Sequence, residues 1–143
     1  MNQILVDLSA STIVNAIESN LFELIKARSL WPRAEVHDDP ELLWSMTDIP
    51  YPHFNLAMRT LIPPEQVDAA IQAAMQRGMQ RHVPMGWWCG PNSRPATLRE
   101  NLAANSFMHV VEMPCMAVDL QQLPEPFQTP GSSASAKLMT PQI

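Results

Sequence analysis

Prolines constrain this chain more than any other feature, because they limit where helices and strands can extend. The chain has 14 prolines. Pro32 ends a helical pattern, since proline disfavours helical geometry in the residue before it. Pro40 follows two aspartates in a turn signal, and Pro63 with Pro64 stops a strand and opens a helix. Pro114 cannot donate to a strand ladder, so it predicts a bulge or sharp bend in the last apolar run.

The segments between these prolines carry helical or strand periodicity. Residues 11–30 indicate a helix, because one apolar stripe recurs at three- and four-residue spacing: Ile13, Ile17, Leu21, Leu24 and Ile25. Ser9 or Ser11 is placed to cap its start. Residues 54–62 alternate in polarity, which indicates a half-buried strand with Asn55 and Arg59 on its polar face. The helix after Pro64 runs to about Arg81, with an inner stripe of Val67, Ile71, Ala74, Met75 and Met79.

Further strands are expected before Asp38, over 42–47, over 85–89 and, bent, over 107–120. Ser93 or Thr97 begins another helix, and Thr97 with Glu100 matches a capping box. Strands that alternate with helices predict an α/β (α+β) fold, in which helices cover a mixed sheet. We assign residues 1–120 to this domain. The Pro-, Ser- and Gln-rich residues 121–143 are interpreted as a linker or C-terminal tail.

Composition restricts the partners of such a domain. The net charge is −5 with pI about 5.2, and the scattered basic residues form no stripe for nucleic acid or for an anionic membrane. Only 16% of residues are charged, which favours a face covered by a second copy or a partner domain. Cys89 and Cys115 are interpreted as free, buried thiols in a reducing compartment. With no signal peptide or membrane-spanning stretch recognised, we expect a cytoplasmic protein.

Five stretches carry a resemblance to a known family: "HFNLAMRTLI", "PPEQVDAAIQAAMQRGMQR", "PMGWWCG", "RPATLRENLAANSF" and "HVVEMPCMAVDL". In that order they resemble the central strand, the next long helix, the following strand, the helix before the last hairpin, and that hairpin of the GNAT superfamily of N-acetyltransferases. They are most similar to the N-terminal, degenerate half of two-domain bacterial GNAT proteins. The resemblance covers about residues 11–120 and implies a mixed, mostly antiparallel sheet flanked by helices.

The resemblance also locates the place where a GNAT enzyme would hold acetyl-coenzyme A. The family uses a glycine-rich loop between the central strand and its helix, where free backbone N–H groups bind the pyrophosphate. Here that junction, "LIPPEQ", has no glycine. Pro63 and Pro64 remove two N–H donors, and Glu65 would repel the phosphates. We therefore expect no cofactor and no catalytic residue, and lean against an enzyme.

The stretch "WWCGPNSRPATL" supplies the candidate ligand residues. Trp87 and Trp88 are neighbours on a strand and point to opposite faces, so one packs inside while the other lines a pocket or interface, unless both faces of the strand are covered. Ser93 and Arg94 precede a helix, where they could bind an anion or only complete a self-satisfied helix start. His53 lies in a proline-rich strand entry and is either a ligand contact or a surface residue.

Other polar groups are given simpler interpretations. Cys89 as a nucleophile is weighed against a core thiol, which is favoured. His37 with Asp38, Asp39 and Glu41 is interpreted as a solvated turn rather than a metal or general-base site, and Arg77 with Arg81 as the solvent face of a helix. No metal site is expected.

Three functions remain open at this point. The first is a non-catalytic small-molecule binding module, with an anionic or acyl ligand near the tryptophans. The second is a protein-interaction subunit that forms a homodimer or docks a partner domain. The third is an N-acetyltransferase with an atypical acetyl-coenzyme A loop.

Overall fold

The computed structural model describes residues 5–119, so the expected tail at 121–143 lies outside the described residues. The α-helices are α1 (Ala10–Lys26), α2 (Val67–Arg81) and α3 (Leu98–Ala104). The strands are β1 (Glu35–Asp38), β2 (Leu43–Met46), β3 (Leu56–Met58) and β4 (Gly86–Trp87). Short 3-10 helices cover Ala27–Leu30, Pro52–Phe54 and Pro64–Gln66. This set of elements confirms the predicted α+β class.

The four strands form one sheet in the order β1-β2-β3-β4. The β1–β2 and β2–β3 pairs are antiparallel, with Glu35 opposite Met46 in the first pair. The β3–β4 pair is parallel, and α2 makes the crossover that a parallel pair requires. The sheet is therefore mixed and mostly antiparallel, as expected. β3 is much shorter than the predicted strand, and Arg59 just after it adopts a positive φ of 47°.

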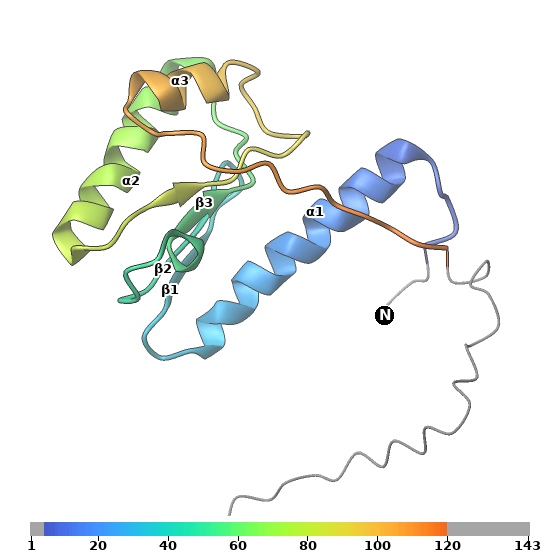
Figure 1. The fold of residues 1–143 in the computed structure, drawn as a ribbon, viewed down its shortest axis with the longest axis horizontal. Helices are drawn as coiled ribbons and strands as arrows, with labels where there is room; N and C mark the ends of the chain where they lie inside the picture. Colours follow the sequence, from blue (N-terminus) through green and yellow to red (C-terminus); the bar gives the residue numbers. More distant parts are fainter. Residues whose placement is uncertain (1–4, 120–143) are drawn as a thin grey trace, which may run out of the picture.

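Helices cover both faces of the sheet, α1 on one side and α2 with α3 on the other (Figure 1). On the α1 side, Leu43 and Met58 pack against Ile25, and all three side chains are at most 1% exposed. On the α2 side, Trp44 and Ala57 form a second cluster with Met46 and Val83. A third cluster joins α2 to α3 and consists of Ile62, Val67, Ile71, Leu98 and Leu102.

The start of α1 follows the predicted capping rule. Ser9 is the N-cap, and its hydroxyl accepts a hydrogen bond from the Thr12 backbone N–H at 3.4 Å. The pKa of Asp7 is lowered because its carboxylate accepts hydrogen bonds. The largest effect comes from the Thr12 hydroxyl, and smaller ones come from the backbone N–H and the hydroxyl of Ser9. Along the helix, the expected stripe is wrong at Leu24, which is 62% exposed, while Glu18 is 6% exposed.

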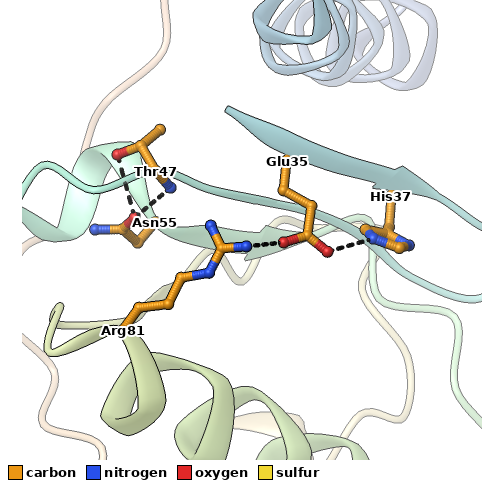
Figure 2. A network of polar contacts seen from close by, with 5 residues as sticks. All are labelled: Glu35, His37, Thr47, Asn55 and Arg81. Carbon is orange, nitrogen blue, oxygen red and sulfur yellow. Dashed lines mark hydrogen bonds and ion pairs between the residues drawn. The ribbon is translucent and has the colours of Figure 1, made fainter. Parts of the chain in front are cut away.

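Polar side chains fasten α2 to β1 (Figure 2). Arg81 forms an ion pair with Glu35, and the other carboxylate oxygen of Glu35 lies 2.8 Å from Nε2 of His37. The His37 ring stacks on Trp44 with centroids 4.1 Å apart, and the Arg77 guanidinium lies 4.7 Å from the same indole. Both arginines thus contact the sheet, although Arg81 remains exposed, as expected for the solvent face of the helix, and Arg77 is partly exposed.

Asn55 organises the loop between β2 and β3 from a fully buried position. Its Oδ1 accepts hydrogen bonds from the backbone N–H of Thr47 at 2.8 Å and from the Thr47 hydroxyl (Figure 2). Its Nδ2 donates to the carbonyls of Ile49 and Tyr51. The backbone carbonyl of Asn55 also accepts from Gly86 N–H at 2.8 Å. The prediction that Asn55 lies on a polar strand face is therefore wrong.

Three local predictions fail beyond β3. Met79 is 65% exposed, and the inner stripe of α2 passes through the buried Gly78 instead. Thr97 is the N-cap of α3 but makes no side-chain capping bond, so the capping box does not form. Residues 107–119 form no strand, so the hairpin implied by the GNAT resemblance is absent over these described residues.

Candidate functional site

Trp87 and Trp88 point to opposite faces of the sheet, and both faces are covered. Trp87 lies on the α2 side, where its ring meets Phe107 edge-on with centroids 6.1 Å apart. Its Nε1 donates to the hydroxyl of Thr60 at 2.9 Å, and Thr60 is fully buried. Trp87 is therefore a partly buried packing residue whose one polar atom has a partner.

Trp88 packs on the α1 side, against the cluster that contains Ile25, Leu43 and Met58. Its Nε1 is buried and has no hydrogen-bond partner among the described residues. Next along the chain, Gly90 approaches α1 so closely that a Cβ added there would lie 1.9 Å from Oε1 of Glu18 and 3.1 Å from Nε1 of Trp88. A larger residue at this position would displace the end of the Glu18 side chain.

Glu18 is a buried acidic residue beside Trp88 and Gly90. Its side chain belongs to α1 and is 6% exposed. The Nδ2 group of Asn92 donates a hydrogen bond to Oε2 of Glu18. The same group donates to Oδ1 of Asn15, and that bond is 2.8 Å long. Within residues 5–119, no Lys, Arg or His side chain forms an ion pair with Glu18. Buried carboxylates are normally paired with a cation, so this one is a candidate for recognition. The sequence alone does not mark this residue, because the glutamate lies within a helix whose apolar stripe it interrupts.

The loop that carries Ser93 and Arg94 satisfies itself. The Ser93 hydroxyl accepts from Gly90 N–H at 2.9 Å. The Arg94 guanidinium donates to the carbonyls of Pro91 and Ser93, at 3.4 and 2.8 Å. Both side chains thus bond within the loop, and neither caps α3, so the expectation that Ser93 caps the helix is wrong.

His53 lies away from these residues. It belongs to the 3-10 helix before β3, where its exposed ring stacks on Tyr51 with centroids 5.2 Å apart and its carbonyl accepts from Arg28. Arg94 instead meets the chain just beyond the other end of β3, where its N–H donates to Thr60 at 2.7 Å. The structure therefore places Trp88 and Ser93 on either side of Gly90. Arg94 lies beside Thr60, His53 lies near the other end of β3, and Trp87 faces the opposite side of the sheet.

Cys89 lies beside this loop and is partly buried. Burial raises the pKa of its thiol above the ordinary value, and the positive charge of Arg99 only partly offsets this. A thiol that resists deprotonation is a poor nucleophile. This environment is that of a packing residue, which the sequence analysis favoured.

The strand–helix junction offers few donors to a phosphate. Pro63 and Pro64 have no N–H, and the N–H of Gln66 donates to the carbonyl of Pro63 at 2.9 Å. Gln66 is the N-cap of α2 and makes no side-chain capping bond, while Glu65 contributes a negative charge before the helix. Across the junction, a parallel bridge joins Leu61 to Arg94. The geometry is therefore poorly suited to a pyrophosphate.

A shallow groove of about 600 Å³ lies between α2 and α3. Oδ1 of Asp68 accepts hydrogen bonds from the amides of Asn101 and Asn105 there, at 3.1 and 3.0 Å. Gln72 and Glu100 complete its polar lining. No group of three or more His, Cys, Asp or Glu side chains suited to a metal ion occurs in the described part of the chain.

Apolar side chains also collect beyond α3, in residues 108–118, which we call the apolar segment. They are Met108, Val110, Val111, Met113, Met116 and Val118, with exposed fractions from 45% to 91%. The segment leaves α3 as an extended trace (Figure 1). No backbone hydrogen bond joins it to another residue within 5–119. A continuous exposed apolar stretch of this kind is a feature of interaction surfaces.

Comparisons with family models, curated proteins and solved structures find no match to this chain. The helices of residues 5–119 include none that is long and apolar enough to cross a membrane.

Proposed function

We propose that this chain is a non-catalytic, GNAT-like interaction domain that associates with a second copy of itself through its apolar segment. The observation that carries the proposal is the exposure of that segment, in which Met108 is 83%, Val110 81% and Met116 91% exposed. Exposed apolar side chains on an unpaired extended backbone favour association with another chain. The low charged fraction of 16% supports the same conclusion.

Two further features bear on this proposal: the junction after β3 argues against acetyl transfer, and the cysteines bear on location. The junction after β3 lacks the glycine-rich loop, and its prolines remove donors that the pyrophosphate would need. Cys89 and Cys115 are both free, which fits the cytoplasmic location that we propose, since reducing conditions keep thiols unpaired.

The first prediction is that Val110→Asp with Val111→Asp abolishes self-association of the full chain. We expect the wild-type chain to exceed its monomer mass of 16.0 kDa in light scattering at high concentration, and the double variant to remain monomeric. The reason is that two carboxylates cannot be desolvated in an apolar interface without partners. Because both valines are exposed in the monomer, the thermal melting temperature should change little.

A matched control removes exposed apolar residues elsewhere. Leu24→Asp with Leu30→Asp replaces side chains that are 62% and 86% exposed, and it should leave the association unchanged. A wild-type chain that stays monomeric at every concentration would contradict the proposal. So would association that survives Val110→Asp with Val111→Asp.

A second candidate function is small-molecule binding where α1 meets the loop after β4. It rests on the buried Glu18 carboxylate, which has no cationic partner among the described residues. A negative group at this place favours a cationic ligand over the anionic one expected from Arg94. The chemical class is an organic amine, which would supply the missing charge.

The second prediction separates this candidate from acetyl transfer by thermal shift. If the candidate is correct, 1,4-diaminobutane raises the melting temperature of the wild-type chain, because a ligand specific for the folded state stabilises it. Glu18→Gln, which keeps the side chain's size, should lose this shift. Acetyl-coenzyme A should cause no shift in either protein. A saturable shift with acetyl-coenzyme A would instead restore the N-acetyltransferase hypothesis, and no amine shift would refute the amine site.

A further inference from the structure

Sulfur-containing side chains gather near the end of the apolar segment, in residues 113–116, whose sequence is "MPCM". Met113 is 45% exposed and Met116 is 91% exposed, and the thiol of Cys115 is exposed and free. Methionine and cysteine are among the residue types that proteins most often bury. Self-association through the segment would use the apolar carbon atoms of these side chains but would make no use of their sulfur atoms.

The structure turns the thiol of Cys115 back toward Met113. Sγ of Cys115 donates to the backbone carbonyl oxygen of Met113 at 3.9 Å. A thiol is a weak donor, so this contact does not hold Sγ against a stronger partner. Neighbouring Cα atoms are about 3.8 Å apart, and the methionine side chain is long, unbranched and adaptable. The sulfur atoms of Met113 and Met116 can therefore reach the surroundings of Sγ of Cys115.

We propose that residues 113–116 form a binding site for Cu(I), with the thiolate of Cys115 and the thioethers of Met113 and Met116 as its ligands. Soft sulfur ligands select Cu(I) over harder cations. Binding forms a bond between copper and Sγ of Cys115, and the thiol proton passes to solvent, because the thiolate is the metal ligand. The copper ion keeps its oxidation state, so the step needs no oxidant or reductant.

The donor set is unsuited to other common cations. Zinc takes thiolate, imidazole and carboxylate ligands, and residues 113–116 supply a single thiolate and neither of the other two groups. Calcium and magnesium require oxygen ligands. Our sequence-based expectation of no metal site took no account of thioethers, which are ligands for a soft ion.

The backbone at this place is open to rearrangement around an ion. No backbone hydrogen bond joins the apolar segment to another residue within 5–119, so closing the side chains around copper breaks no ladder or helix. Cys89 is a poorer ligand than Cys115, because it is partly buried and burial raises the pKa of its thiol. The thiolate that a metal needs therefore forms more readily at Cys115.

The test is an anaerobic titration of the full chain with Cu(I), in competition with a coloured Cu(I) chelator. We expect the wild-type chain to bind a single Cu(I) ion tightly, and Cys115→Ser to lose this binding, since a hydroxyl is a poor ligand for a soft ion. Met113→Leu with Met116→Leu keeps apolar side chains but removes both thioethers. Loss of an outer-shell partner already lowers metal affinity by about 10–100-fold, so this variant should lose at least about tenfold.

The controls separate a sulfur site from capture of copper by any thiol. Met79→Leu makes the same change at a methionine that lies in α2 and is 65% exposed, and it should leave the affinity unchanged. X-ray absorption at the copper edge should show only sulfur neighbours in the wild type, and fewer of them in Met113→Leu with Met116→Leu. Copper affinity that survives this double substitution would overturn the site, as would binding that survives Cys115→Ser.

The copper site and the self-association do not depend on each other, and the same variants test them separately. Val110→Asp with Val111→Asp should abolish association and leave the Cu(I) affinity unchanged. Met113→Leu with Met116→Leu should lower the Cu(I) affinity while association persists, because leucine and methionine exchange at nearly constant volume. A monomeric chain that binds copper refutes only the proposed function. A chain that associates but does not bind Cu(I) refutes only the copper site.

Discussion

Asn55→Ala is expected to lower the free energy of unfolding by about 3 kcal/mol, the combined cost of a lost hydrogen-bond network and a small cavity. In a chain of this size, the corresponding fall in the melting temperature is about 10 °C. Chemical and thermal unfolding followed by circular dichroism would measure both.

The physical reason lies in the four hydrogen bonds of a fully buried side chain. The backbone N–H of Thr47 donates to Oδ1 of Asn55 at 2.8 Å, and Thr47 is itself fully buried, so alanine leaves that donor without its partner. The carbonyls of Ile49 and Tyr51 lose the Nδ2 donor as well. An unsatisfied buried group costs more than the bond itself contributed.

Asn20→Ala is the matched control for this prediction. Asn20 is exposed within α1, and alanine favours a helix more than asparagine does. The control should therefore leave stability unchanged or raise it slightly. If Asn55→Ala behaved like Asn20→Ala, the Asn55 network would not hold the loop before β3.

Trp87→Ala is expected to lower the free energy of unfolding by about 3–5 kcal/mol. The indole packs against clusters on the α2 side of the sheet, contacts Phe107 edge-on, and donates to the buried hydroxyl of Thr60. Alanine would leave a cavity and an unpaired hydroxyl at once. Equilibrium denaturation in urea would give the value.

The adjacent tryptophan provides the comparison that isolates the polar atom. Trp87→Phe keeps an aromatic ring but leaves the Thr60 hydroxyl without its donor, so we expect a loss of about 1–2 kcal/mol. Trp88→Phe removes an Nε1 that has no partner in the described structure, so we expect a change near zero. If the two phenylalanine substitutions had equal effects, the hydrogen bond of Trp87 would have no special weight.

Local signals predicted much of the fold. The Ser9 cap, the turn between β1 and β2 and the two prolines before α2 act on residues within one or two turns of the chain, and each gave the right kind of element. The prediction for 107–119 was wrong because apolar alternation marks a possible strand, and a strand also needs a neighbour to pair with.

The candidate sites were harder to predict for the same reason. The sequence marked Trp87, Trp88, Ser93 and Arg94, which lie on or beside one strand–loop segment. It did not mark Glu18, because a glutamate in a helical stripe is usually solvated. Glu18 is distinguished only by its contact with Gly90 and Asn92, which lie far along the chain.

The sequence by itself determined the fold class, the order of elements up to α3 and the absence of a glycine-rich junction, since each follows from residues close together in the chain. Only the tertiary structure decided that both tryptophans are covered and that His53 and Arg94 lie at opposite ends of β3. It also decided which polar side chains became buried. The burial of a side chain and its hydrogen-bond partners depend on tertiary contacts between segments far apart in the sequence. Composition and periodicity do not specify those contacts.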